Sequence, residues 1–178
     1  MPRLFVAIDL PEWVTASLAA IQPPKVPGLR LVDRSLMHLT LHFLGDSNVE
    51  RTSSLLRDVV APVVPLSIEK VGLFRGRTTI AWAGVRMSAE LAELHARLAS
   101  ALRRAGFEPE VRPYHPHITL ARCEPRVPES LLLQFLESHA EFSLPAILAT
   151  SVHLFSSDVT GAAPVYRNEA SFELASSG

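Results

Sequence analysis

The feature of this chain that most restricts its fold is an internal repeat. The pattern His-x-Thr-Leu occurs twice, as HLTL from His38 and as HITL from His117, at an offset of 79 residues. The elements expected around both copies follow one order: strand, helix, His-x-Thr-Leu strand, helix and strand. The matching segments are 5–10 with 80–85, and the strands that end at Phe74 and Phe155. We interpret this as a duplication, which favours two similar lobes over one doubly wound parallel sheet.

The spacing of apolar residues and turn residues predicts the individual elements. Strands are expected at residues 3–10, 30–33, 36–44, 64–74, 78–86, 117–122, 142–156 and 165–174. Helices are expected from residue 11 until the prolines at 23 and 24, from Ser47 or Asn48 to residue 60, from Ser88 to Ala105, and over 129–140. Helices interspersed with strands that are joined by short turns predict an α+β fold.

Composition and charge limit the class of protein. The chain has 178 residues, the size of one ordinary domain, and 48% of them are hydrophobic, enough for a sizeable core. Lys and Arg number 17 against 18 Asp and Glu, so any contact with nucleic acid has to be local. The single cysteine, Cys123, fits a reducing compartment. Because the start does not resemble a signal peptide and no apolar run reaches roughly 18 residues, we expect a soluble cytoplasmic protein.

The two His-x-Thr pairs are the candidate chemical groups. Because side chains alternate along a strand, His38 and Thr40 share one face, as His117 and Thr119 do, and the apolar residues between them face the core. Two imidazoles that meet across a cleft can act as general base and general acid near neutral pH. Two hydroxyls can donate hydrogen bonds to a phosphate between them. A single pair is usually an ordinary strand feature, but two copies at matching places in a repeat indicate a functional site.

The same residues carry a resemblance to a known family. HLTLHFLG and PHITLAR resemble the paired signatures of the 2H phosphoesterase superfamily. RLFVAIDLP near the start, and AWAGV after Phe74, are similar to segments of the RNA 2′,3′-cyclic phosphodiesterases, a group also labelled 2′-5′ RNA ligase. This resemblance implies one domain over residues 1–178, made of two intertwined lobes related by a pseudo-twofold axis. Antiparallel sheets are then expected to line a central cleft, with the helices outside.

The resemblance also implies a reaction. His117 then accepts a proton from water, and His38 donates a proton to the leaving ribose oxygen. Thr40 and Thr119 hold the phosphoryl oxygens. The substrate is RNA with a 2′,3′-cyclic phosphate terminus, the product is a 2′-phosphate, and the reverse reaction is 2′-5′ ligation. Neither a metal nor a cofactor is required, and we expect a monomer. The alternatives are a non-catalytic binder of RNA ends and a phosphodiesterase for 2′-5′ linked oligonucleotides.

Four further residues are candidates for substrate contacts: Phe74, Arg122, His42 and Tyr114. On a regular strand His42 shares the face of His38 and Thr40, at a position where the family more often carries Lys or another polar residue. The family often has Arg at the position of Arg122. Regular alternation directs Arg122 away from His117, so a role in phosphate binding requires a twist or a bulge at the end of the strand.

Aromatic residues and other arginines complete the set. Phe74 and Phe155 end equivalent strands, so either could stack on a base; core packing is the alternative for Phe74 and our expectation for Phe155. Tyr114 could flank the cleft or serve the turn that follows it. A His-x-His pair at His115 and His117 has no Asp, Glu or Cys nearby in a ligand pattern, apart from Cys123 and Glu124 just past the strand, and we expect no metal site there. The arginines expected at the rim are Arg34, Arg75 and Arg77.

Overall fold

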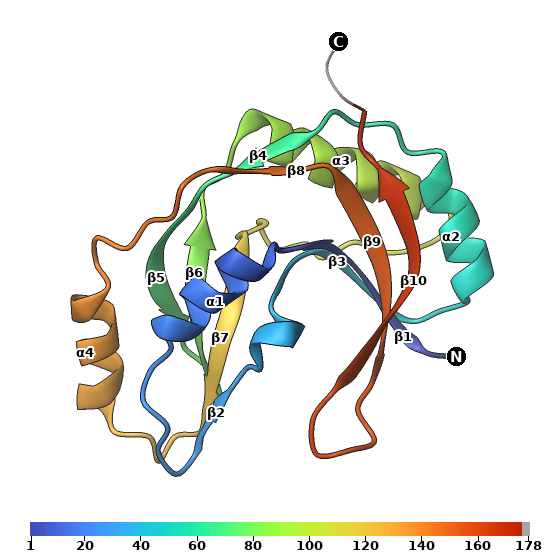
Figure 1. Ribbon diagram of the computed structural model, residues 1–178. Coiled ribbons are helices and arrows are strands. Elements are labelled where there is room, and N and C mark those ends of the chain that lie inside the picture. The colour runs from blue at the N-terminus through green and yellow to red at the C-terminus, as the bar shows by residue number, and fades with distance from the viewer. Residues whose placement is uncertain (176–178) are drawn as a thin grey trace.

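The computed structural model describes residues 1–175 and has the expected α+β fold (Figure 1). The helices are α1 (Glu12–Ala20), α2 (Val49–Arg57), α3 (Ala89–Arg104) and α4 (Glu129–Ser138), with a 3-10 helix η1 (Arg34–Leu36). The strands are β1 (Arg3–Asp9), β2 (Leu29–Leu31), β3 (His38–Asp46), β4 (Val64–Leu66), β5 (Ile68–Phe74), β6 (Thr79–Val85), β7 (His117–Cys123), β8 (Ile147–Ala149), β9 (Ser151–Asp158) and β10 (Val165–Glu173). Two antiparallel sheets have the orders β10-β9-β1-β3 and β2-β7-β6-β5, and β4 pairs with β8.

The register of the two large sheets repeats the internal similarity of the sequence. Strands β9, β1 and β3 of one sheet correspond to β5, β6 and β7 of the other. The corresponding cross-strand pairs are Ala7–Thr40 with Trp82–Thr119, Asp9–His38 with Gly84–His117, and Phe5–Phe155 with Ile80–Phe74. Because β9 comes from the second copy of the repeat and β5 from the first, each large sheet contains strands from both copies.

A bulge occurs at the same place in both motif strands. The flanking pairs are Val6–His42 and Ala7–Thr40 in one sheet, and Ala81–Ala121 and Trp82–Thr119 in the other. Leu41 and Leu120 are therefore the extra residues, without a partner on β1 or on β6. One extra residue reverses the alternation of faces beyond the bulge. This reversal decides which side chains after each motif share the face of the histidine and the threonine.

The other face of the motif strands belongs to the core. Leu39 and Ile118, which lie between the histidine and threonine of each motif, have no exposed surface. Helix α3 begins at Ser88, whose Oγ accepts a hydrogen bond from the Leu91 amide at 3.0 Å. Its buried residues are Leu91, Leu94, Leu98, Ala99, Ala101 and Leu102. Each fully buried leucine contributes roughly 1.5–3 kcal/mol, and this helix packs against β3 and β4, so it supports the first motif strand.

Two of the expected strands are divided in the structure. The segment 64–74 forms β4 and β5, because the chain leaves the β4–β8 pair at Ser67 and then joins β6. The segment 142–156 is divided in the same way, since β8 ends at Ala149 and β9 begins at Ser151. The two divided segments pair with each other through β4 and β8. The expectation of one continuous strand in each segment is therefore wrong.

Two further boundaries also differ from expectation. The motif strand begins at His38 rather than Leu36, because the carboxylate of Asp33 accepts a hydrogen bond from the Ser35 amide at 2.9 Å and caps η1. Helix α2 is capped by Asn48 and ends at Arg57, three residues before the expected end. No helix within the described residues 1–175 is long and apolar enough to cross a membrane.

Candidate active site

The two motif histidines begin strands β3 and β7, which contact each other. Both rings are partly buried and have matching bonds. Nδ1 of His38 lies 2.7 Å from the carbonyl oxygen of Leu36, and Nδ1 of His117 lies 2.7 Å from the carbonyl oxygen of His115. A carbonyl oxygen can only accept, so each Nδ1 carries the hydrogen. The Nε2 of each neutral ring is therefore unprotonated and free to exchange a proton with a substrate.

Burial lowers the pKa of both motif histidines. For His38 the bond to Leu36 and the charge of Asp9 oppose this effect, while the charges of His117 and Arg122 add to it. For His117 the bond to His115 opposes burial, and Arg122 again lowers the pKa. The two imidazoles are thus close enough for the charge of His117 to affect the pKa of His38. A bound anion between them would favour the protonated form of one ring, as a general acid requires.

Thr40 and Thr119 lie two residues after the histidines, on the same face, and both are partly exposed. Within residues 1–175 neither hydroxyl forms a hydrogen bond, so both are available as donors. The hydroxyl of Tyr114 donates to the carbonyl oxygen of Thr40 at 2.8 Å. Tyr114 comes from the loop before β7, so this bond ties the approach to the second motif to the first. This bond holds the backbone of Thr40 in place, and a substrate contact by Tyr114 stays a prediction.

Arg122 lies on the motif face because Leu120 forms a bulge. Regular alternation would direct Arg122 away from His117. The bulge reverses the alternation, so Arg122 lies on the same face as His117 and Thr119. Its guanidinium is exposed and has no acidic partner in the described part of the chain, residues 1–175. Arg30 of β2 lies directly opposite Arg122. Two like charges opposite each other repel, so a bound anion on this face relieves the repulsion.

The equivalent bulge at Leu41 places His42 on the core side. His42 is only 7% exposed, and its Nε2 lies 3.0 Å from the carbonyl oxygen of His95. The rings of His42 and His95 stack with their centroids 4.2 Å apart. The expectation that His42 shares a face with His38 is therefore wrong. The residue that reaches the motif side here is Phe43, which is 68% exposed and lies opposite Phe5.

Aromatic rings surround His117. Phe74 meets its ring edge to face, with centroids 4.8 Å apart at 87°. Trp82 lies 5.1 Å from Phe74 and directly opposite Thr119. The indole rests over Gly72, where a Cβ atom would come within 2.2 Å of the ring. The indole Nε1–H of Trp82 is the only buried side-chain nitrogen or oxygen in residues 1–175 without a hydrogen-bond partner. Phe74 thus packs against the motif histidine and remains partly exposed.

A pocket of about 530 Å³ lies beside His38 and not beside His117. Figure 1 shows η1 facing the β9–β10 hairpin, and the pocket lies between these elements. Its lining is Phe5, Asp9, Asp33, Ser35, Leu36, Met37, His38, Phe155, Ala163, Pro164, Val165 and Tyr166. Phe155, expected in the core, is partly exposed and stacks on Phe5 at 5.4 Å. Phe5 and Tyr166 were not among the expected site residues, since no local pattern marks a ring that reaches the site from a neighbouring strand.

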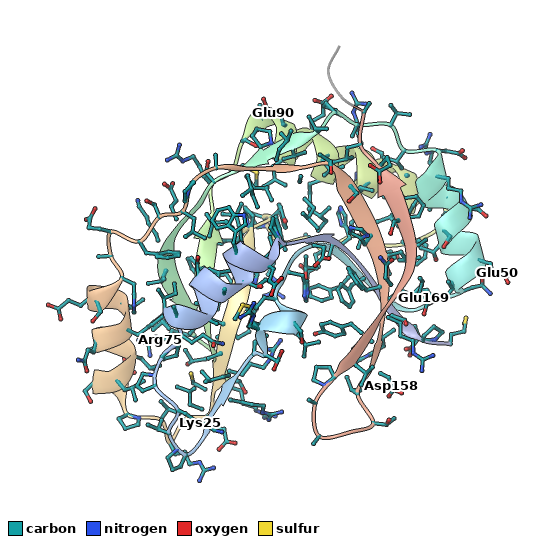
Figure 2. The ribbon with its side chains drawn as sticks, viewed as in Figure 1. Lys25, Glu50, Arg75, Glu90, Asp158 and Glu169 are labelled. Carbon is teal, nitrogen blue, oxygen red and sulfur yellow. The ribbon has the colours of Figure 1, made fainter. Side chains whose placement is uncertain are left out.

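Two of the expected rim arginines form ion pairs. Arg75 lies on the side of α4 (Figure 2) and binds both carboxylate oxygens of Glu129, at 2.7 and 2.5 Å. Arg34 lies 3.2 Å from Glu12. No group of three metal-ligating side chains gathers anywhere in residues 1–175. His115 packs against Phe74 and Trp82 instead.

Comparison with known families decides where this chain belongs. The family model described as the 2′-5′ RNA ligase superfamily matches residues 11–160, which include both motifs. This chain belongs to the 2′-5′ RNA ligase superfamily. The resemblance inferred from the two motifs is thereby confirmed.

Individual superfamily members are similar over most of the chain. A protein of Methanocaldococcus jannaschii named RNA 2′,3′-cyclic phosphodiesterase is 28% identical over 168 residues, covering 92% of this chain and 96% of its own. The Escherichia coli protein of the same name is 35% identical over 128 residues, covering 67% and 71%. The crystal structure of E. coli LigT complexed with 3′-AMP matches with a TM-score of 0.75 at 28% identity, over 97% of this chain and 98% of that one. This match confirms the expected fold class.

Proposed function

We propose that this protein hydrolyses the 2′,3′-cyclic phosphate at the end of an RNA and leaves a 2′-phosphate. The relatives named RNA 2′,3′-cyclic phosphodiesterase support the reaction class. The observation that carries the mechanism is the matched pair of histidines, each with Nδ1 bonded to a carbonyl oxygen and Nε2 free. An acid and a base of equivalent geometry suit a reaction in which one proton is taken up and another is delivered.

In the proposed mechanism the bond to O3′ breaks as water attacks phosphorus. Nε2 of His117 accepts the proton of the attacking water, and Nε2–H of His38 donates a proton to O3′. The oxygen of water becomes part of the phosphate, which remains attached through O2′. The hydroxyls of Thr40 and Thr119 donate to the phosphoryl oxygens, and Arg122 offsets the additional negative charge of the transition state.

The position of the 530 Å³ pocket supports this assignment of roles. In an in-line displacement the attacking and leaving oxygens lie on opposite sides of phosphorus. The leaving oxygen belongs to the ribose, so the terminal nucleoside lies on the side of the general acid. The pocket with room for a nucleoside lies beside His38, and its aromatic lining of Phe5 and Phe155 suits a base. His38 is accordingly the acid and His117 the base.

Ligation is the same displacement with the 5′-hydroxyl of a second RNA in place of water. Its oxygen attacks phosphorus and gives its proton to His117, O3′ leaves with a proton from His38, and a 2′-5′ linkage results. The superfamily name favours this second activity. One site serves both nucleophiles, and water in excess favours hydrolysis. A non-catalytic role in binding RNA ends does not require two free Nε2 atoms. A phosphodiesterase for 2′-5′ linked oligonucleotides would use the same four residues on a longer substrate.

The test is incubation of the protein, in EDTA, with three oligonucleotides: one with a 2′,3′-cyclic phosphate, one with a 2′-5′ linkage and one with a 3′-phosphate. We expect conversion of the first to a 2′-phosphate. Release of a 3′-phosphate, or cleavage of only the 2′-5′ linkage, would contradict the proposal. His38→Ala and His117→Ala should each nearly abolish turnover, and the double variant should be little worse, because the two residues act as a unit.

A further inference from the structure

The tyrosine at position 166 lies beside the proposed general acid. Its ring meets the imidazole of His38 edge to face, with centroids 5.4 Å apart at 82°. It also meets Phe5 at 5.0 Å and 72°. Both contacts fix the ring of Tyr166, which reaches the site from β10 and lines the pocket next to His38.

Arg122 lies on the motif face of β7 because of the bulge at Leu120, close enough for its charge to act on Tyr166. Burial raises the pKa of Tyr166, so the group remains a donor, and the charge of Arg122 partly opposes the shift. The same guanidinium lowers the pKa of His38 and of His117. Across residues 1–175 the Tyr166 hydroxyl makes no hydrogen bond and Arg122 makes no ion pair. Two donors that no described residue engages thus lie near His38, an arrangement that suits an oxyanion, while the carboxylates of Asp9 and Asp33 also line the pocket.

We infer that the Tyr166 hydroxyl donates a hydrogen bond to the phosphoryl group of the substrate, together with Arg122 and on the side of His38. This inference rests on the proposed function and adds a contact to it. The two threonines are equivalent in the repeat, so they cannot distinguish one histidine from the other. Strand β10 extends the first sheet beyond β9, whereas the second sheet ends at β5. Among residues 1–175 Tyr166 therefore has no counterpart near His117, and it orients the cyclic phosphate with O3′ toward His38.

The test is Tyr166→Phe, which keeps the ring contacts with His38 and Phe5 and removes only the hydroxyl. We expect kcat/KM on the cyclic phosphate to fall roughly 10- to 100-fold, and the Kd for inorganic phosphate to rise roughly tenfold or more. The matched control is Asn168→Ala on the same strand. The Asn168 amide already contacts Ser171 and His153 at 3.0 and 3.1 Å, so its loss should leave both quantities unchanged.

The two readouts separate the possible outcomes. Loss of activity together with weaker phosphate binding supports the inference. Loss of activity with unchanged phosphate binding would overturn it, because the hydroxyl would then act on His38 rather than on the substrate. Unchanged values in both assays would overturn it as well. If the unmodified protein does not hydrolyse cyclic phosphates, the proposed function fails, and the phosphate affinity alone still decides whether Tyr166 binds the anion.

Discussion

Adding one methyl group at Gly72 should disturb both the stability and the activity of the protein. A Cβ atom there would lie 2.2 Å from Cζ2 and 2.3 Å from Cη2 of Trp82, whereas ordinary contacts begin at 3.4 Å. In Gly72→Ala the indole therefore has to move by about 1 Å, or the strand has to move away from it. Overpacking of this kind costs about 1–3 kcal/mol, which lowers the Tm of a protein of this size by roughly 2–12 °C.

The same displacement should reach the catalytic groups. Trp82 lies opposite Thr119, and its ring centroid is 6.4 Å from that of His117. A misplacement of about 1 Å can cost on the order of 100-fold in rate, so we expect kcat/KM to fall roughly 10- to 100-fold. Thermal unfolding and initial-rate kinetics measure the two effects. Fluorescence of Trp82 in a Trp13→Phe background, which removes the other tryptophan, reports the movement of the indole.

Gly76→Ala provides the matched control for this substitution. A Cβ at Gly76 would meet only the carbonyl oxygen of Thr78, at 3.6 Å, and the residue does not have a positive φ. It should keep the Tm, the emission spectrum and the rate of the unmodified protein. If Gly72→Ala behaved in the same way as Gly76→Ala, the close packing of Trp82 against β5 would be refuted as a support of the site.

Three other predictions concern the site and its surroundings. Thr40→Val and Thr119→Val keep the branched side chain but remove a donor, so each should lower kcat roughly 100-fold without a large change in Tm; full turnover in both would exclude the phosphate-binding role. EDTA should leave the rate unchanged, and loss of activity that Zn²⁺ or Mn²⁺ restores would contradict a metal-free mechanism. Burial and the nearby charge of His42 lower the pKa of His95 to about 4. The unfolded chain therefore binds a proton that the folded chain does not, and the free energy of unfolding should fall as the pH drops from about 6.5 towards 4. His95→Gln should make this decrease shallower in urea titrations, and an unchanged pH dependence would show that His95 titrates normally.

The repeat made much of the fold predictable. The offset between the two motifs matched the strands in pairs, and the alternation of faces placed each histidine with its threonine. The long apolar segments 64–74 and 142–156 were harder to interpret. Their residue pattern is the same whether the strand is continuous or the chain moves to another sheet, as it does at Ser67 and before Ser151. Both segments are divided because β4 pairs with β8, and local sequence does not encode pairing between strands so far apart.

The bulges explain the wrong orientation expected for His42 and supply the condition that was set for Arg122. Neither glycine nor proline marks them, since the extra residues are Leu41 and Leu120, which are typical of regular strands. Alternation without the bulges therefore places His42 on the motif face and Arg122 on the core face, the opposite of what the structure has. The resemblance to the family indicated Arg122 as a substrate contact, and the bulge at Leu120 places it on the face of His117. Tyr166 was missed because it reaches His38 only through the pairing of four strands.

The division of roles between the histidines can be measured with a substrate whose leaving oxygen is replaced. In an RNA end with sulfur in place of O3′ in the cyclic phosphate, the leaving group departs as a thiolate and needs no proton. We expect His38→Ala to be nearly inactive on the oxygen substrate and to recover most of its turnover on the sulfur substrate. His117→Ala should remain nearly inactive on both, because water still has to lose its proton. Recovery of His117→Ala, or equal inactivity of His38→Ala on both substrates, would contradict the assignment of acid and base.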